Sequence, residues 1–535
     1  MVNSTRVTLV RPVHSSVYGV YKTLRKNAGT VGIPKDREIK PPLGLLYLAS
    51  ALESIGADVT IIDAEPEVLS TEAIVEKVVA SEPHYVGVTS TTPEFHEATD
   101  IIRYVKSCNP GIITMMGGAH VSALPEESLQ DCPEIDYVVV GEGEESIKKI
   151  VMERPDTRIV VSEPIQDLNQ LPSPARHLVN YEHYQFPEPS CGLVKTDALE
   201  TSRGCPFRCA FCYHMHSKVR FRDVVKVVDE VELSHRQTGA TLFNFFDDTF
   251  TLVKERAMAI CDEIIRRDLG LTFYCFTRAD TLSKELLEKM KQAGFVRITM
   301  GIESGNQEML DRLRKGTKLE DYERAYRWMD GLGIETRGSF IIGGPFETHQ
   351  TIEDSINFAR KLPLYRIGVN ILTPYPGTEL YRIALNGEHG LRLLCRDWRE
   401  FRRWGNSVVE TDCLSASDLE YYQKKFLRRF YASRKVVFHH IKQFLKGNHS
   451  YFFFRPVIFA VVDRLVTAFA EFFRPHKFVP PSSEGESEGG LGQPCSEPVR
   501  LEIRSPGLPE DGKPEITSRF GKREEVGGGV VREKD

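Results

Sequence analysis

The 535-residue sequence lacks a continuous apolar run of the roughly 20 residues that a membrane-spanning helix needs. Its first residues, MVNSTRVTLVRP, also lack the apolar core and the small-residue cleavage site of an export signal. The formal net charge of −6 provides no excess of cations for binding nucleic acid. We therefore expect a cytoplasmic protein with no nucleic-acid partner and no transmembrane span.

Cysteine accounts for 11 of the 535 residues, and a reducing compartment disfavours a disulfide framework. Three of these cysteines nevertheless fall within eight residues, in the stretch RGCPFRCAFC at 203–212. A disulfide pairs two cysteines, so three at the spacing C-x3-C-x2-C leave one over. The spacing indicates thiolate ligands of a metal centre rather than a disulfide.

The N-terminal region, residues 5–155, alternates strand and helix patterns. Continuously apolar strands between helices are typical of a parallel sheet that is covered on both faces. We predict a doubly wound, Rossmann-like α/β domain whose ligand lies beyond the carboxyl ends of the strands. The five expected strands are 7–12, 58–63, 85–92, 112–118 and 136–144.

A second α/β series is expected in residues 197–387, after an irregular linker at 156–196. Its six βα units predict a partial (β/α)6 barrel of the TIM type rather than a full eight. Functional residues of such a barrel lie at the carboxyl ends of the strands. The expected strands are 198–202, 241–246, 272–277, 296–302, 337–343 and 366–372.

The C-terminal region is expected to be helical over residues 388–475, which are rich in arginine and aromatic residues. Charged residues and a proline interrupt its apolar segment at 451–475, which favours an amphipathic helix over a membrane span. That helix is expected either to pack on the barrel or to make a peripheral contact with a membrane. Residues 476–535 are dense in Gly, Pro, Ser and Glu and predict a disordered tail.

The cysteine triplet follows the first strand of the expected barrel, where barrel active sites lie. Structural zinc needs four ligands, and His214 and His216 are close but give a cramped site. Closely spaced thiolates favour an iron–sulfur cluster. Three thiolates leave one iron of a four-iron cluster open to a substrate or cofactor. The alternative is three unrelated core cysteines, which the spacing and the neighbouring Gly204 and Pro206 disfavour.

At this point the motif CPFRCAFC resembles the signature of the radical S-adenosylmethionine (SAM) family, over residues 197 to about 385. The resemblance implies that Cys205, Cys209 and Cys212 bind a [4Fe–4S] cluster, with Tyr213 as the usual aromatic residue beside it. The fourth iron chelates the amino and carboxylate groups of SAM in that family. One electron, from a donor such as flavodoxin or ferredoxin, then generates a 5′-deoxyadenosyl radical that abstracts hydrogen.

Further motifs stand in the family's order after barrel strands two to five: FFDDTFT, FTRAD, MGIESGN and GSFIIGGPFET. The resemblance implies that they contact the amino group, the carboxylate, the ribose and the adenine of SAM, with a guanidinium suited to the carboxylate. The alternative for the two aspartates is a helix cap, and Glu347 is expected to cap its loop structurally. The residues implied for SAM are Tyr213, Asp247, Asp248, Arg278, Glu303, Ser304 and Ile341.

The N-terminal domain resembles the cobalamin-binding domain of cobalamin-dependent radical SAM enzymes, with PPLGLLYLA, STTPEFHEA, MMGGAHVS and VVGEGEESI in family order. The D-x-H-x-x-G signature, whose histidine ligates cobalt, is absent, and His14 does not fit it. The resemblance implies a nucleotide tail buried in the sheet and no protein imidazole under cobalt. Ordinary βα turns are the alternative.

Small residues let the backbone approach a cofactor closely. His120 is expected as a loop or corrin-side residue rather than a cobalt ligand. The residues expected along the tail and corrin are Ser90, Thr91, Thr92, Gly117, Gly118, His120 and Gly141.

The combined resemblance implies a methyltransferase that acts on an unactivated carbon or phosphorus through a 5′-deoxyadenosyl radical and methylcobalamin. The same architecture resembles the anaerobic magnesium-protoporphyrin IX monomethyl ester cyclase, and RGCPFRCAFC and GEGEE fit both. A non-catalytic cobalamin or redox sensor is a third hypothesis, which would not need the complete set of barrel motifs. We favour methyl transfer to a small-molecule substrate. A lipid-like molecule or a tetrapyrrole, being amphipathic, would suit the C-terminal region, and the catalytic residues of the pocket are not identified.

Overall fold

The computed structural model describes residues 4–13, 39–188, 192–213 and 215–445. These residues belong to one compact unit, Met1–Pro481. The predictions for the segment 451–475, for the tail 476–535, and for His14 and His214 concern residues outside the described ranges.

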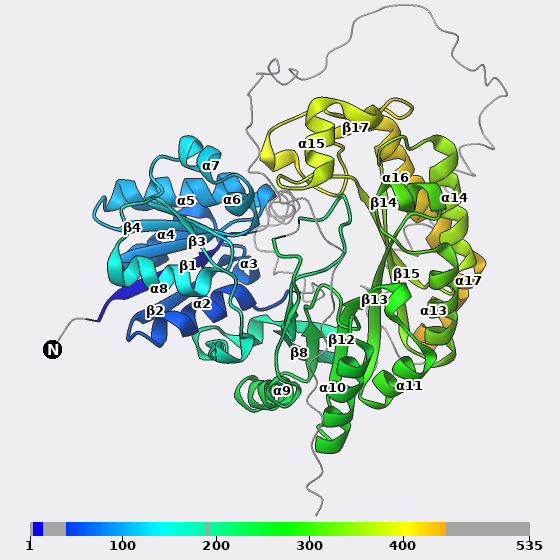
Figure 1. Cartoon of the computed structure of the whole chain (residues 1–535), viewed down its shortest axis with the longest axis horizontal. Coiled ribbons are helices and arrows are strands. Elements are labelled where there is room, and N and C mark those ends of the chain that lie inside the picture. The colour runs from blue at the N-terminus through cyan, green and yellow to red at the C-terminus, as the bar shows by residue number, and fades with distance from the viewer. Residues whose placement is uncertain (1–3, 14–38, 189–191, 214, 446–535) are drawn as a thin grey trace, which may run out of the picture. The chain divides into compact units, whose positions relative to one another are not determined.

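The first sheet of the described chain is parallel, with the strand order β2-β1-β3-β4-β5-β6. This order reverses direction between β1 and β3, which is the switch point where doubly wound folds bind their ligands. Apolar side chains of α2 and α8 pack on one face, and those of α4 and α5 pack on the other (Figure 1). The doubly wound prediction is confirmed. The strands are β1 (Arg6–Arg11), β2 (Asp58–Asp63), β3 (Tyr85–Thr89), β4 (Ile113–Gly117), β5 (Tyr137–Val140) and β6 (Ile159–Val161).

The helices of this region alternate with the strands along the chain. Polar side chains cap two of them: Asp63 caps α3, and Ser70 caps α4 by accepting the Ala73 N–H. The helices are α2 (Leu43–Glu53), α3 (Ala64–Glu67), α4 (Thr71–Ala80), α5 (Phe95–Cys108), α6 (Ala119–Ala123), α7 (Pro125–Asp131) and α8 (Gly143–Glu153), with a 3-10 turn at η1 (Thr92–Glu94).

The prediction of five strands is wrong, because a sixth strand lies in the segment 156–196 that was predicted to be a linker. This segment contains β6, the short turns η2 (Leu168–Gln170), η3 (Arg176–Leu178) and η4 (Tyr181–His183), and β7 (Gln185–Glu188). A three-residue edge strand such as β6 is too short to show periodicity in the sequence. Buried Arg176 anchors this segment, because its guanidinium pairs with Asp197 at 2.5 Å and with Glu230 at 2.7 Å.

The second large sheet has the order β15-β14-β13-β12-β11-β8-β7, parallel except for the β7–β8 pair. Its six parallel strands confirm the partial (β/α)6 barrel, with helices outside the curved sheet (Figure 1). The first strand begins six residues earlier than predicted, because β8 extends back to pair with β7. The strands are β8 (Gly192–Leu199), β11 (Leu242–Phe245), β12 (Thr272–Thr277), β13 (Phe295–Glu303), β14 (Glu335–Ile342) and β15 (Arg366–Ile371).

A short antiparallel pair, β9 (Ser202–Arg203) with β10 (Arg220–Phe221), closes the loop that carries the three cysteines. The helices of the barrel cover its outer face and contribute to its apolar core together with the strands. They are α9 (Val224–Thr238), α10 (Lys254–Arg267), α11 (Lys284–Gln292), α12 (Gln307–Arg312), α13 (Leu319–Gly331), α14 (His349–Lys361) and α15 (Glu379–Asn386), with the turn η5 (Ala279–Thr281).

The prediction of a helical region from residue 388 is wrong in its first part. Two turns, η6 (Glu388–Gly390) and η7 (Trp398–Glu400), accompany a strand pair of β16 (Leu391–Leu393) and β17 (Val409–Thr411). Helices α16 (Ala416–Tyr431) and α17 (Arg434–Leu445) follow. The Tyr431 hydroxyl bonds the backbone of Ile367, so α16 covers the last barrel strand.

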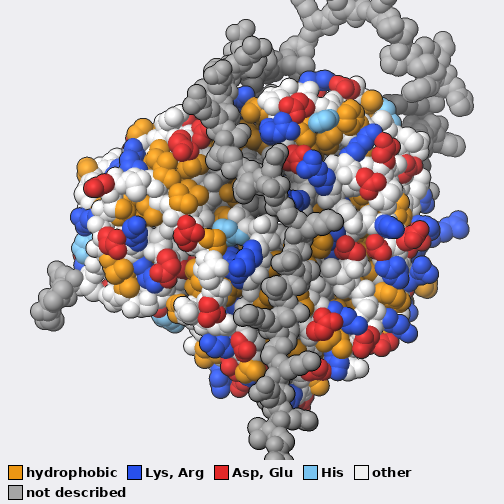
Figure 2. Space-filling view, in the orientation of Figure 1, with side chains coloured by type: hydrophobic (Ala, Val, Ile, Leu, Met, Phe, Trp, Pro, Cys, Tyr) orange, Lys and Arg blue, Asp and Glu red, His pale blue; other side chains and the backbone are white. Residues whose placement is uncertain are grey.

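Alternation along the barrel strands divides their side chains between the helices and the interior. In β14, Gly338, Phe340 and Ile342 are buried toward the helices, whereas Arg337 and Ser339 face the interior of the curve. Charged side chains of both signs are interspersed over the face shown in Figure 2. No helix among the described residues is long and apolar enough to cross a membrane.

Candidate active site

A cavity of about 1000 Å³ lies within the curve of the barrel sheet, and Cys205, Cys209 and Cys212 all line it. No three His, Cys, Asp or Glu side chains in the described ranges converge on a point as the ligands of a single ion would. The sulfurs instead lie along the wall of a large cavity. This fits a multi-iron cluster, in which each thiolate binds a different iron, better than one zinc ion.

Backbone contacts hold the cysteine loop in place. Gly204 has a φ of +96°, and a Cβ there would lie 2.5 Å from the Lys218 carbonyl oxygen, so glycine is required. The Cys205 N–H donates to the His216 carbonyl at 3.3 Å, and the Ala210 N–H donates to Leu313 at 3.0 Å. The loop is thereby fixed to its own hairpin and to the segment after α12.

Cationic side chains surround the middle cysteine. A hydrogen bond with Cys212, together with the charges of Lys315 and Arg278, outweighs the effect of burial and lowers the pKa of Cys209 to about 6. Nη1 of Arg278 lies 3.9 Å from the Cys209 sulfur. Burial raises the pKa of Cys205. The cations fit a cluster that three thiolates make negatively charged.

Four of the residues predicted for SAM line this cavity: Tyr213, Asp248, Arg278 and Glu303. The Arg278 guanidinium stacks 3.5 Å over the Phe207 ring and pairs with Asp280 at 2.9 Å. Two guanidinium nitrogens, Nε and Nη2, are therefore already bound to a carboxylate of this chain. The third nitrogen, Nη1, faces the cysteine loop.

Glu303 is held beside the cysteines by an ion pair. Its carboxylate lies 2.9 Å from the Lys315 ammonium, and both side chains are buried. Burial opposes the charge on Lys315, but Glu303, Tyr322 and Cys209 together outweigh it and raise the pKa of the lysine. A Cβ at Gly301 would overlap the Glu303 carboxylate, so glycine leaves room for it.

The other three residues predicted for SAM do not line the cavity. The buried Asp247 carboxylate accepts hydrogen bonds from the Thr201 N–H at 3.2 Å, the Thr201 hydroxyl at 2.7 Å and the Ser202 hydroxyl. Ser304 lies 3.1 Å from Ser355 of α14. Ile341 packs against the apolar core. Asp247 and Ser304 thus tie strand ends to their neighbours, because adjacent residues at a strand end point to opposite sides.

A second cavity, of about 580 Å³, enters the N-terminal sheet from the carboxyl ends of its strands. Its mouth includes Thr91, Gly117, Gly118 and Gly141, as predicted for cobalamin. Deeper in, it is an apolar slot between the sheet and helices α2 and α8. The slot is lined by Leu9, Leu45, Leu48, Gly87, Met115, Val139 and Ile147.

Glycine is required at Gly118, and the absence of a side chain at Gly87 leaves space in the slot. Gly118 has a φ of +108°, and a Cβ there would lie 2.9 Å from the Ser90 nitrogen and nearer still to its carbonyl oxygen. A Cβ at Gly87 would lie 2.9 Å from the Leu9 side chain. The small residues leave a space into which a flat group fits.

Ser90, Thr92 and His120 do not line the slot. His120 is buried beside Phe95, at 4.2 Å between ring centres, and beside Trp398 at 5.1 Å. Its Nδ1 lies 3.3 Å from the Thr92 hydroxyl. Burial lowers the pKa of His120 to about 3, so it is a neutral packing residue between α5 and the C-terminal region.

Comparison with known proteins finds a family match in each of the two α/β regions that contain the cavities. Residues 31–151 match the B12 binding domain family, and residues 199–359 match the Radical SAM superfamily. An uncharacterized methyltransferase of Pyrococcus horikoshii is 31% identical over 453 residues, which cover 79% of this chain and 95% of that protein. The chain belongs to the cobalamin-dependent radical SAM enzymes.

Other proteins that are similar to this radical SAM enzyme belong to the same broad group. The anaerobic magnesium-protoporphyrin IX monomethyl ester cyclase of Rubrivivax gelatinosus is 28% identical over 425 residues, covering 74% of this chain and 75% of that protein. The radical SAM methyltransferase TsrM of Kitasatospora setae, solved with cobalamin and a [4Fe–4S] cluster, shares the fold. Its TM-score is 0.60 at 19% identity, with 82% of this chain and 90% of that chain covered.

The comparisons confirm the predicted family, an enzyme of the methyltransferase class, and the predicted cofactors, which are a [4Fe–4S] cluster, SAM and cobalamin.

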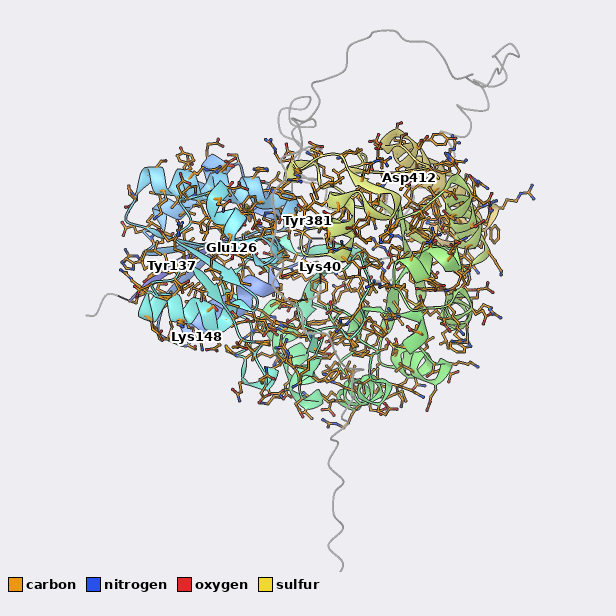
Figure 3. The ribbon with its side chains drawn as sticks, turned by 45° about the horizontal axis from the view of Figure 1, so that its top comes forward. Lys40, Glu126, Tyr137, Lys148, Tyr381 and Asp412 are labelled. Carbon is orange, nitrogen blue, oxygen red and sulfur yellow. The ribbon has the colours of Figure 1, made fainter. Side chains whose placement is uncertain are left out.

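The two cavities of the radical SAM enzyme share a wall. Glu142, Glu200, Arg203 and Phe246 line both of them. Glu142 follows β5 in the GEGEE loop, and Arg203 stands two residues before Cys205. Lys40, labelled in Figure 3, also lines the barrel cavity, with its ammonium 5.1 Å from the centre of the Phe246 ring.

Buried ion pairs hold this wall together. Arg203 pairs with Glu144 at 2.7 Å and with Glu200 at 2.8 Å, and Arg220 donates to Glu142. Burial opposes the charge of Glu142, but its hydrogen bond with Arg220 keeps its pKa below the usual range. Ion pairs thus join the GEGEE loop to the hairpin that carries the cysteines.

Several lining residues were missed by sequence reasoning. Lys315 lies outside the motifs used to predict the SAM residues, and it is recognised only by its contact with Glu303. The polar residues on the interior face of the strands could have been found from the sequence. In these strands a charged or polar residue alternates with apolar ones. These interior residues are Asn244, Arg297, Thr299, Arg337, Ser339 and Asn370.

Proposed function

We propose that this enzyme transfers a methyl group from SAM, by way of cobalamin, to an unactivated carbon or phosphorus of a small molecule. The observation that carries the proposal is the wall of Glu142, Glu200, Arg203 and Phe246 that the barrel cavity and the sheet slot share. A methyl carrier in one cavity would face a substrate in the other across this wall. Residues 5–155, with β6, would form the cobalamin domain, and residues 197–387 the radical SAM barrel.

Cys205, Cys209 and Cys212 would hold the cluster, because they line one cavity on a loop fixed by its backbone. When bound, the cluster supplies the electron that cleaves SAM, and cobalamin carries the methyl group. Arg278 and Lys315 place positive charge beside Cys209. That charge stabilises the anionic thiolates. Flavodoxin or ferredoxin would supply the electrons.

For SAM we keep Tyr213, Asp248, Arg278 and Glu303, which line the cavity, and we add Lys315. The acidic residues suit the amino group, and the cations suit the carboxylate. Three residues would act indirectly, by holding in place the strand ends that carry the lining residues: Asp247, Ser304 and Ile341.

For cobalamin we keep Thr91, Gly117, Gly118 and Gly141 at the mouth of the slot. The apolar slot between the sheet, α2 and α8 fits the aromatic base of a nucleotide tail, since apolar walls without a side chain at Gly87 leave room for a flat ring. Ser90 and Thr92 would shape the turn behind the mouth rather than touch the cofactor.

The experiment is anaerobic incubation of the reconstituted enzyme with methyl-deuterated SAM, a reductant and cell extract, followed by mass spectrometry. The expected result is a small molecule that carries the deuterated methyl group and is missing when the Cys209→Ala variant is used. An unlabelled, dehydrogenated product would instead indicate oxidative cyclisation. Release of the labelled methyl group to no product would contradict both reactions.

A further inference from the structure

Helix α17, the last helix that the structure describes, exposes an apolar stripe. Phe438 is 70% exposed, Ile441 is 50% exposed and Leu445 is 78% exposed. These three positions are three and four residues apart, so they lie on one face of the helix. A single exposed apolar residue is ordinary on a protein surface, whereas three on one helical face form a patch that indicates an interaction.

The opposite face of α17 anchors the helix to the barrel. Val436 and His440 are one turn apart and buried. The ring of His439 stacks on Tyr365, with 3.6 Å between the ring centres. The Lys435 ammonium donates to two carbonyl oxygens at the C-terminal end of α14. The helix is thus fixed on the outer side of the barrel (Figure 1), and its packing there does not use the apolar stripe.

Positive charge accompanies the apolar stripe. Residues 421–445 contain seven Lys and Arg residues and no Asp or Glu, although the whole chain has a net charge of −6. Two exposed cations belong to α17 itself, where Arg434 stands one turn before Phe438 and Lys442 follows Ile441. Neither of them forms an ion pair with the part of the chain that the structure describes. The helix therefore presents an apolar stripe that is bordered by positive charge.

This charge favours one kind of partner over two others. A second copy that paired through the same face would bring Arg434 and Lys442 against their own equivalents, because a two-fold interface uses the same patch twice. The apolar segment 451–475 of this chain contains three arginines and two acidic residues, so it offers no excess of negative charge. The surface of an anionic bilayer offers an apolar layer and negative headgroups together.

We propose that α17 is a membrane-docking helix that lies in the plane of an anionic bilayer surface. Phe438, Ile441 and Leu445 enter the boundary between the headgroups and the acyl chains. Arg434 and Lys442 contact the phosphate groups, which long basic side chains reach from such a position. No residue of α17 lines the cavity that contains the three cysteines, so the inference does not depend on the function proposed above.

The test is anaerobic sedimentation of the full chain, with its cluster and cobalamin, in the presence of lipid vesicles. One set of vesicles contains phosphatidylcholine alone, and the other contains phosphatidylcholine and phosphatidylglycerol in equal parts. The protein is expected to sediment with the anionic vesicles, and added salt should weaken this binding because it screens the cations. No binding to the anionic vesicles, or equal binding to both sets, would overturn the proposal.

Four variants test whether α17 makes the contact. Ile441→Ser should weaken binding to the anionic vesicles about tenfold, because it removes an apolar side chain from the bilayer. Lys442→Gln should weaken it about fivefold, because it removes one cation from the surface. The matched controls change exposed residues of α10 and α11, Ile265→Ser and Lys284→Gln, and should bind as the wild type does. Unfolding temperatures show that each variant is folded.

Two other results would contradict the proposal. Folded Ile441→Ser and Lys442→Gln proteins that bind the vesicles as tightly as the wild type would assign membrane binding to another segment. A wild-type protein that is dimeric in size-exclusion chromatography without lipid, beside a monomeric Phe438→Ser variant, would show that a second copy of the chain covers the stripe.

Discussion

Replacing Gly118 by alanine should disrupt the mouth of the slot that we propose for cobalamin. Gly118 follows β4 with a φ of +108° and a ψ of 179°, a conformation reserved almost entirely for glycine. A Cβ added there would lie 2.9 Å from the Ser90 nitrogen and nearer still to the Ser90 carbonyl oxygen. Both neighbours are backbone atoms, so the turn after β3 or the turn after β4 must move.

The expected cost follows from these two effects. A side chain in this backbone region costs about 1–3 kcal/mol. Forcing an extra carbon against fixed atoms costs about 1–3 kcal/mol more. The free energy of unfolding of the N-terminal domain should therefore fall by about 2–6 kcal/mol. Because Gly118 lines the slot, cobalamin binding should weaken as well.

The assay is urea unfolding followed by circular dichroism, together with corrin absorbance retained after desalting. Gly331→Ala is the matched control, because nothing lies within 4 Å of the added carbon on α13. That variant should gain up to about 0.5–1 kcal/mol, since alanine loses less conformational freedom on folding. A Gly118→Ala protein with the unfolding midpoint and corrin content of the wild type would refute the reasoning.

Three further predictions concern the cysteines, the shared wall and a buried acid. Cys209→Ala should lose both cluster absorbance and formation of 5′-deoxyadenosine, whereas the variant of exposed Cys413 should keep both, and equal behaviour of the two would contradict the cluster assignment. Arg220→Gln removes a buried partner of Glu142 and should lower stability by up to about 3–5 kcal/mol in thermal unfolding, with an unchanged midpoint as the contrary result. Burial raises the pKa of Glu347 to about 7. The folded state thus holds a proton that the unfolded state loses near pH 4.3, and stability from this group falls as the pH rises from about 4.3 to 7. Glu347→Gln should flatten that slope in urea unfolding at pH 5 and pH 7, and parallel slopes would contradict the assignment.

The strands of the barrel could be predicted well because they are apolar runs bounded by turn residues. The predicted range 272–277 coincides with β12. The edge strands β6 and β7 were missed, because they have three and four residues and are defined by their pairing with a neighbour. The strands β16 and β17 were missed for the same reason.

The site residues could be predicted where a sequence motif determines the chemistry. They could be predicted less well where the role of a residue depends on which way its side chain points. The spacing of the cysteines predicts a cluster loop, and all three cysteines line one cavity. The neighbouring acids Asp247 and Asp248 could not be separated, since only the folded chain shows that Asp247 turns inward to Thr201 while Asp248 lines the cavity. The packing of His120 against Trp398 could not be predicted, because the two residues are distant in sequence.

The central claim is that SAM serves this enzyme both as methyl donor and as the source of the radical. The direct measurement is the ratio of products in one anaerobic reaction with substrate, reductant and SAM, quantified by mass spectrometry. Methyl transfer by way of cobalamin predicts S-adenosylhomocysteine, 5′-deoxyadenosine and methylated product in equal amounts. Formation of 5′-deoxyadenosine with substrate consumed and no S-adenosylhomocysteine formed would contradict it.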